Sequence, residues 1–155
     1  MVNEADGQVY EKHAEELIRF ATGLVGPSDA PDVVSGAVLN CLSARAWPTL
    51  SNPRAYLFRA VLNEARHHHR STGRRRIREE RAAQPGTVDP PEVRPEVLEA
   101  VSRLSVRQRA VTVLTYWADL DPASIARLLD ISEGSVRRHL ARARAHLRET
   151  LHDDF

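Results

Sequence analysis

The segment between residues 121 and 144 carries the signals of two short helices separated by a tight turn, and it limits the folds open to this chain. Asp121 can cap a helix N-terminus, and Pro122 follows at the first helical position, where its missing N–H costs nothing. Apolar residues recur at helical spacing on both sides of the turn: Ile125, Leu128, Leu129, then Val136, Leu140, Ala143. Two helices joined by a turn of about three residues predict a helix-turn-helix.

The second helix of this pair has the charge of a helix that reads DNA. Arginines lie outside its apolar stripe, a pattern that suits a helix lying in a major groove. The free N–H groups of its first turn favour a phosphate. We therefore predict DNA contacts from Ser132, Glu133, Gly134, Ser135, Arg137, Arg138 and Arg142. Glu133 fits two roles equally, accepting a hydrogen bond from cytosine or stabilising the helix dipole.

The remaining chain predicts an all-α fold without strands. Helical spacing of apolar residues covers 10–25, 30–42 and 53–65 in the front half, and 97–104 and 106–117 behind it. Between them the periodicity stops, and four of the nine prolines gather at Pro85, Pro90, Pro91 and Pro95. We therefore expect two small helical domains, residues 1–81 and 96–155, joined by a flexible, proline-rich linker over 82–95.

Positive charge is concentrated rather than spread. Residues 66–81 contain seven arginines against Glu79 and Glu80, a balance of +5, in a chain whose net charge is only +1. Such a run is often only a solvated face, but arginines this close repel each other without an anion. Arginine supplies 21 of the 22 cationic residues, which a coding bias also explains. The segment is a candidate phosphate-binding surface.

Several other classes of function find no support in the sequence. Cys41 is the single cysteine, so no internal disulfide can form and a reducing compartment fits. No apolar run suits a signal peptide or a membrane span, so we expect a cytoplasmic protein without membrane insertion. Consecutive His67, His68 and His69 point in different directions along a helix, and we expect no metal and no cofactor. The sequence contains no recognisable nucleophile–base pair and no glycine-rich phosphate loop, so nothing in it indicates an enzyme.

Four motifs in order resemble the two-domain bacterial sigma factors of the extracytoplasmic-function type. They are the stretch from Asp32 to Leu39, the stretch from Pro53 to Asn63, the Leu104–Arg109 opening of the back domain, and the helix-turn-helix from Ile131 to Arg144. One such motif would be a weak signal, because helix-turn-helices are widespread. Four in the family's order, covering nearly the whole chain, are a strong one.

The resemblance implies three functional surfaces. In this family the front domain contacts core RNA polymerase and reads the promoter −10 element, and the back domain reads the −35 element. It implies polymerase contact from Asp32, Ser35 and Leu39, although Asp32 also simply suits a helix N-terminus. It implies that Asn63 grips a flipped base, where the alternative is an ordinary polar residue at a helix end. Phosphates near the melted strand would be held by Arg66, Arg70, Arg74, Arg75 and Arg76.

The chain departs from the family pattern at two places. Ser35, Gly36 and Val38 replace the usual Gln, Glu and aromatic residue, and a glycine in mid-helix costs about 0.5–1 kcal/mol relative to alanine. In the turn, the common glycine is Asp130, at a position that we expect to need a left-handed backbone. Replacing Asp130 by Gly should therefore stabilise the back domain.

The resemblance identifies the chain as a sigma factor that binds core RNA polymerase and promoter DNA and directs promoter-specific initiation. An anti-sigma factor is a further partner that many relatives have. Two alternatives stay open: a stand-alone helix-turn-helix regulator without polymerase contact, favoured by Ser35, Gly36 and Val38, and a sigma-like decoy for an anti-sigma factor, which the arginine-rich segments disfavour.

Overall fold

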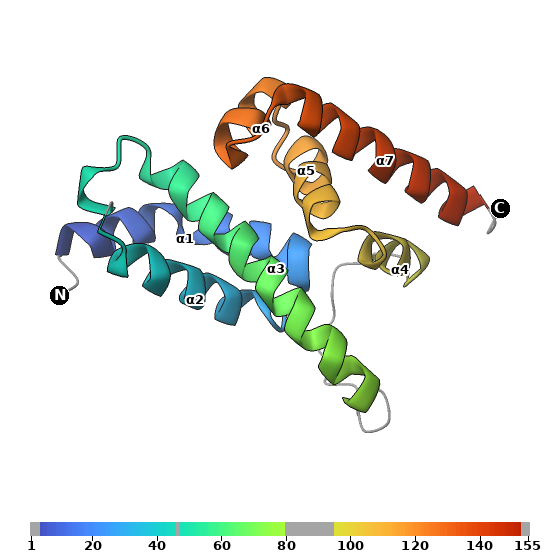
Figure 1. Ribbon diagram of the computed structural model, residues 1–155, viewed down its shortest axis with the longest axis horizontal. Helices are drawn as coiled ribbons and strands as arrows, with labels where there is room; N and C mark the ends of the chain where they lie inside the picture. Colours follow the sequence, from blue (N-terminus) through green and yellow to red (C-terminus); the bar gives the residue numbers. More distant parts are fainter. Residues whose placement is uncertain (1–3, 46, 80–94, 153–155) are drawn as a thin grey trace.

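The computed structural model describes residues 4–45, 47–79 and 95–152, and these residues form helices and no strands (Figure 1). The all-α prediction is therefore confirmed for the described part of the chain. The elements are α1 (Glu4–Val25), α2 (Ala30–Ser43), the short 3-10 helix η1 (Trp47–Thr49), α3 (Pro53–Glu79), α4 (Pro95–Ser102), α5 (Val106–Tyr116), α6 (Pro122–Leu129) and α7 (Glu133–His152). The linker predicted over 82–95 lies outside the described residues except for Pro95, which begins α4.

The predicted helix starts are confirmed in atomic detail. The Asp121 carboxylate accepts a hydrogen bond from the backbone N–H of Ser124 at 2.7 Å, and Pro122 occupies the first turn of α6. Ser105 and Gln108 form the reciprocal capping box at the start of α5, with N···O distances of 3.2 and 3.1 Å. Each cap satisfies N–H groups that a helix N-terminus otherwise leaves without a partner.

The helix ends follow the expected backbone rules. Helix α1 ends at Val25, and Gly26 follows it with φ of 88°. Glycine suits this position because a residue with a side chain rarely adopts such a conformation. Asp130 ends α6 in the left-handed conformation, with φ of 55° and ψ of 49°. The prediction of a left-handed turn residue is confirmed, and Asp bears this strain better than most residues other than glycine.

The front helices α1, α2 and α3 pack as a bundle around an apolar core. The buried faces are those that the periodicity predicted, including Leu17, Phe20, Val34 and Val61. Two polar contacts fix the outer edge of the bundle. The Trp47 indole donates to Asp6 at 2.8 Å, and Arg54 of α3 forms a bidentate pair with Glu16 of α1 at 2.8 and 3.1 Å.

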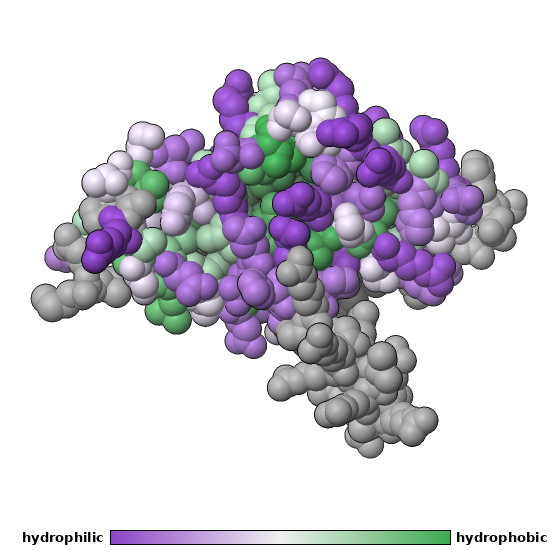
Figure 2. All heavy atoms as spheres, in the orientation of Figure 1, coloured by the Kyte–Doolittle hydropathy of each residue, from purple (hydrophilic) through white to green (hydrophobic). Residues whose placement is uncertain are grey.

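The back helices pack mainly on α7. Helices α4, α5 and α6 all contact α7, and Leu114 of α5, Ile125 of α6 and Val136 of α7 are buried. On the face shown in the space-filling view, the coloured residues are mostly hydrophilic (Figure 2). The helix-turn-helix is therefore built on a small apolar core with its polar face outward.

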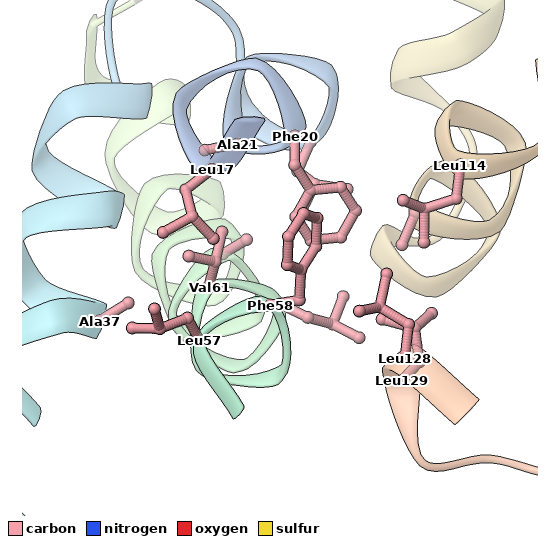
Figure 3. Close-up of a cluster of buried hydrophobic side chains, with 14 of the residues drawn as sticks. Leu17, Phe20, Ala21, Ala37, Leu57, Phe58, Val61, Leu114, Leu128 and Leu129 are labelled. Carbon is pink, nitrogen blue, oxygen red and sulfur yellow. The ribbon is translucent and has the colours of Figure 1, made fainter. Parts of the chain in front are cut away.

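Front and back helices also pack on each other. The buried side chains of both halves belong to one continuous cluster, and α1 and α3 contact α5 and α6. Figure 3 shows Phe20 and Phe58 of the front bundle facing Leu114, Leu128 and Leu129 of the back helices. In this conformation the two halves share a core.

Candidate nucleic-acid interface

The outward face of α2 presents the three residues predicted for polymerase contact. Asp32, Ser35 and Leu39 are exposed, whereas Val34 and Ala37 between them are buried in the front core. Leu39 is 64% exposed, which is unusual for a large aliphatic side chain in the described part of the molecule. The structure thus brings the three side chains to one accessible helix face.

The packing of α3 on α2 explains why residue 36 is a glycine, which the sequence did not reveal. A Cβ added there would lie 3.1 Å from the Glu64 carboxylate oxygen Oε1, so glycine leaves room for the Glu64 side chain over α2. The second carboxylate oxygen of Glu64 accepts a hydrogen bond from the Asn40 amide at 3.5 Å. The missing side chain at Gly36 therefore lets α3 place a carboxylate close to α2.

Asn63 is exposed on α3 and lines a pocket of about 430 Å³ between α2 and α3. We call it the base pocket, after the role predicted for Asn63. It is lined by Asn40, Cys41, Tyr56, Arg59, Ala60, Asn63, Glu64 and His67. The motif analysis singled out Asn63 alone. A signal for some of its α3 neighbours was present in the sequence, because Tyr56, Ala60, Asn63 and His67 recur at the spacing of one helix face. The α2 residues Asn40 and Cys41 gave no such signal.

The base pocket combines amide, carboxylate and guanidinium groups with an aromatic wall. The Arg59 guanidinium lies over the Tyr56 ring at 5.9 Å, and the Tyr56 ring packs against Trp47 with centroids 6.2 Å apart. Burial raises the pKa of the Cys41 thiol to about 11, so this sulfur stays protonated at neutral pH and is a poor nucleophile. The chemistry on offer is hydrogen bonding and stacking.

The arginine-rich segment continues α3 beyond the base pocket. Arg66 is partly buried, and the helix runs on through Arg70, Arg74, Arg75 and Arg76, whose side chains are outside the described part of the structure. In the same stretch, His68 Nε2 lies 3.1 Å from the Asp29 carboxylate at the start of α2. His68 therefore ties two front helices together.

The N-terminus of α7 is capped by Ser132 as predicted, and other side chains of its first turn interact with residues of the same helix. The Ser132 hydroxyl accepts from the backbone N–H of Ser135 at 3.0 Å, and the Ser135 hydroxyl accepts from Arg138 at 3.3 Å. Glu133 forms an ion pair with Arg137, one turn further on. This pair is a contact of Glu133 that neither the cytosine nor the dipole alternative included, and Gly134 beside it is exposed.

A concentration of positive charge extends from α7 to the start of α5. Burial lowers the pKa of His139, and the positive charges of Arg107, Arg142 and Arg138 lower it further. Arg107, which the sequence analysis did not select, therefore belongs to the same electropositive surface as the predicted contacts. Such a surface attracts phosphates, and its affinity depends on salt.

Among the described residues, none of the helices combines the length and apolar character that crossing a bilayer requires. The same residues contain no cluster of three or more His, Cys, Asp or Glu side chains that could hold a metal ion.

The structure thus combines a helix-turn-helix that carries an arginine-rich surface with a second helical bundle that carries a polar pocket, and a helix-turn-helix is typical of proteins that bind DNA. Two family models match the chain: sigma-70 region 2 over residues 9–75 and sigma-70 region 4 over residues 94–147. The extracytoplasmic-function RNA polymerase sigma factor SigL of Mycobacterium tuberculosis is 32% identical over 94% of this chain and 88% of its own length. The RNA polymerase sigma-E factor of Streptomyces antibioticus is 28% identical over 93% of this chain and 83% of its own length.

Solved structures agree with these sequence relatives. The sigma factor RpoE of Bartonella quintana, solved in complex with the anti-sigma factor NepR, superposes with a TM-score of 0.69 over 99% of this chain and 100% of its own, at 21% identity. CnrH, solved in complex with the cytosolic domain of CnrY, gives 0.65 over 97% and 90% of the chains, at 26% identity. The chain belongs to the sigma-70 family and resembles its extracytoplasmic-function members along most of its length. It is a sigma factor that directs transcription initiation, and proteins of this family are regulators.

Proposed function

We propose that this sigma factor works through three surfaces carried by two domains, residues 1–81 and 96–155. The exposed face of α2 with Asp32, Ser35 and Leu39 contacts core RNA polymerase. The base pocket and the arginines that follow it on α3 engage the −10 element. Ser132 and the first three turns of α7, through Arg142, engage the −35 element, with Arg107 extending that surface. These roles place its action in the cytoplasm, with polymerase and DNA.

The observation that carries this proposal is the setting of Asn63 in the base pocket. An enzyme or factor that takes a base out of the stack needs a pocket offering hydrogen bonds to the base edge and an aromatic face for stacking. Asn63 both donates and accepts, and Tyr56 supplies a ring in the same pocket. Unstacking costs a few kcal/mol, which contacts of this kind can offset.

The structural relatives indicate a further partner. RpoE was solved with the anti-sigma factor NepR, and CnrH with the cytosolic domain of CnrY. We propose that an anti-sigma factor also holds this chain. The alternative of a stand-alone regulator predicts no co-purification with core polymerase, which a pull-down measures directly.

Replacing Asn63 by Ala tests the role of the base pocket. We expect the variant to lose most of its promoter melting, measured as permanganate reactivity of unpaired thymines in the polymerase complex, while duplex binding stays close to that of the wild type. Gln8→Ala, an exposed change on α1, is the matched control and should alter neither. An equal loss of melting and duplex binding in Asn63→Ala would reject the pocket as a base site.

A further inference from the structure

The last residue of α5, Tyr116, contacts an arginine of α7. The Arg144 Nε–H donates a hydrogen bond to the Tyr116 hydroxyl oxygen at 2.6 Å, and the guanidinium carbon of Arg144 lies 5.5 Å from the centre of the Tyr116 ring. Both side chains are on the surface, and Tyr116 is 61% exposed. One tyrosine therefore holds the guanidinium of Arg144 through two different contacts, from a helix other than its own.

The Tyr116 contact orients Arg144 without neutralising its charge. A tyrosine hydroxyl is a neutral acceptor, and in the described part of the chain Arg144 has no acidic partner. Arg137, seven residues earlier and on the same side of α7, is instead paired with the Glu133 carboxylate. The Tyr116 hydrogen bond uses Nε, so the two terminal nitrogens of Arg144 remain for a bidentate contact with an anion.

The place of Arg144 along α7 suits a contact with the DNA backbone rather than with a base. From Glu133 to Arg144 an α-helix rises about 16 Å, at about 1.5 Å per residue. The major groove is about 12 Å wide. If the first turn of α7 contacts base edges, the helix has therefore reached the phosphates that border the groove by the time it arrives at Arg144. Arginine contacts to phosphate are among the commonest protein–DNA hydrogen bonds.

We propose that Arg144 binds a phosphate of the promoter backbone beside the −35 element, and that Tyr116 is the positioning residue that holds its guanidinium for this contact. This inference rests on the proposed −35 surface and adds to it a pair of residues from two helices. A contact to the backbone strengthens binding and fixes how α7 lies on the duplex, but it does not distinguish one base from another.

The salt dependence of promoter binding tests the Arg144 contact. Fluorescence anisotropy measures the binding of the full-length protein with core polymerase to a promoter duplex, at a temperature that keeps the duplex closed. Arg144→Ala should weaken binding by about ten-fold. The slope of log K against log salt should fall by about 0.9, the value for one phosphate contact. A duplex with a scrambled −35 element should show the same fold-loss, because the contact does not read sequence.

Two variants of α7 are the matched controls. Arg144→Lys keeps the positive charge and should restore most of the slope. Arg148→Ala removes the same charge one turn further along the exposed side of α7, where no described tyrosine holds it, and should change the slope by less than half as much as Arg144→Ala.

Tyr116→Phe tests the positioning role. This change keeps the ring beside the guanidinium and removes only the hydroxyl that accepts from Nε. We expect promoter binding to weaken by about three-fold. The loss should disappear when Arg144 is already Ala, because the hydroxyl acts through Arg144. A tie that only joins α5 to α7 would instead lower Tm in both single variants and leave the salt slope unchanged.

Three results would overturn the proposal: an unchanged slope in Arg144→Ala, an equal change in Arg148→Ala, or losses that add fully in the Tyr116→Phe/Arg144→Ala double variant. So would weaker binding of Arg144→Ala to core polymerase in a pull-down without DNA, which would make the pair a protein contact. Failure of the proposed function gives a different pattern, because the wild type itself then binds the promoter and scrambled duplexes equally and yields no start-site-specific transcript.

Discussion

Replacing Gly23 by Ala gives a quantitative test of the close approach of α1 to α5. The added Cβ would lie 2.6 and 3.1 Å from the two methyl carbons of Val113, closer than carbon atoms normally approach. Valine is stiff at χ1, so its side chain cannot turn aside cheaply. Overpacking of this kind costs about 1–3 kcal/mol, and the gain in helix propensity returns about 0.5–1 kcal/mol. We expect a net loss on the order of 1 kcal/mol in the free energy of unfolding.

Gly7→Ala is the matched control, because it makes the same change on the same helix. A Cβ at Gly7 meets nothing within 4 Å, so only the propensity gain of up to about 0.5–1 kcal/mol remains. Two glycine-to-alanine changes on α1 should therefore shift stability in opposite directions.

Urea and thermal unfolding measure both variants. At this chain length, 1 kcal/mol corresponds to about 2–4 °C in Tm. Val113→Ala should rescue Gly23→Ala, with a coupling energy of about 0.5–3 kcal/mol in a double-mutant cycle, because it removes the crowding methyl groups. A Gly23→Ala variant as stable as Gly7→Ala would refute the close approach of α1 to α5 on which this reasoning depends.

Three further predictions concern the turn, the polymerase face and the acid limit of stability. Asp130→Gly and Asp130→Asn both lose the ion pair with Arg59, but only Gly relieves the left-handed backbone, so Asp130→Gly should have the higher Tm; the reverse order would contradict the turn geometry. Leu39→Ala should weaken core polymerase binding in a pull-down and leave Tm within about 1 °C, since the side chain is 64% exposed; unchanged binding would remove Leu39 from the interface. Burial raises the pKa of Glu16, but hydrogen bonds from Arg54 and a neighbouring histidine outweigh it and leave the pKa below its usual value of 4.5. The ionised Glu16 carboxylate therefore stabilises the fold above about pH 4.5, and this stabilisation is lost as the pH falls below that value. Glu16→Gln should flatten the acid limb of a curve of stability against pH. An unchanged acid limb would contradict this role.

Local features of the fold could be predicted because each depends on a few neighbouring residues. The capping box at Ser105, the Asp121 cap and the left-handed Asp130 follow from side-chain hydrogen bonding and backbone sterics within one turn. The apolar stripes likewise predicted which faces are buried, and the family motifs pointed to Asn63 and Leu39, which are both exposed.

The packing of the front bundle on the back helices and the base pocket could not be predicted in the same way. Nothing in the sequence marks Arg109 as buried, and only the tertiary packing brings it to the Leu24 carbonyl, 85 residues away along the chain. In the sequence Gly36 is only a residue that weakens its helix, and Gly23 carries no prediction, whereas in the structure each leaves room for a side chain of another helix. Helical periodicity shows that a face is buried, but it does not show which helix covers it.

In vitro transcription with purified core polymerase tests the central claim most directly. Templates selected from the native genome, each carrying a −10 and a −35 element, are transcribed with core polymerase alone and with the protein added. We expect transcripts with a defined start site that require the protein and that diminish when either the −10 or the −35 element is scrambled. Transcription that is unchanged by the protein on every such template would contradict it.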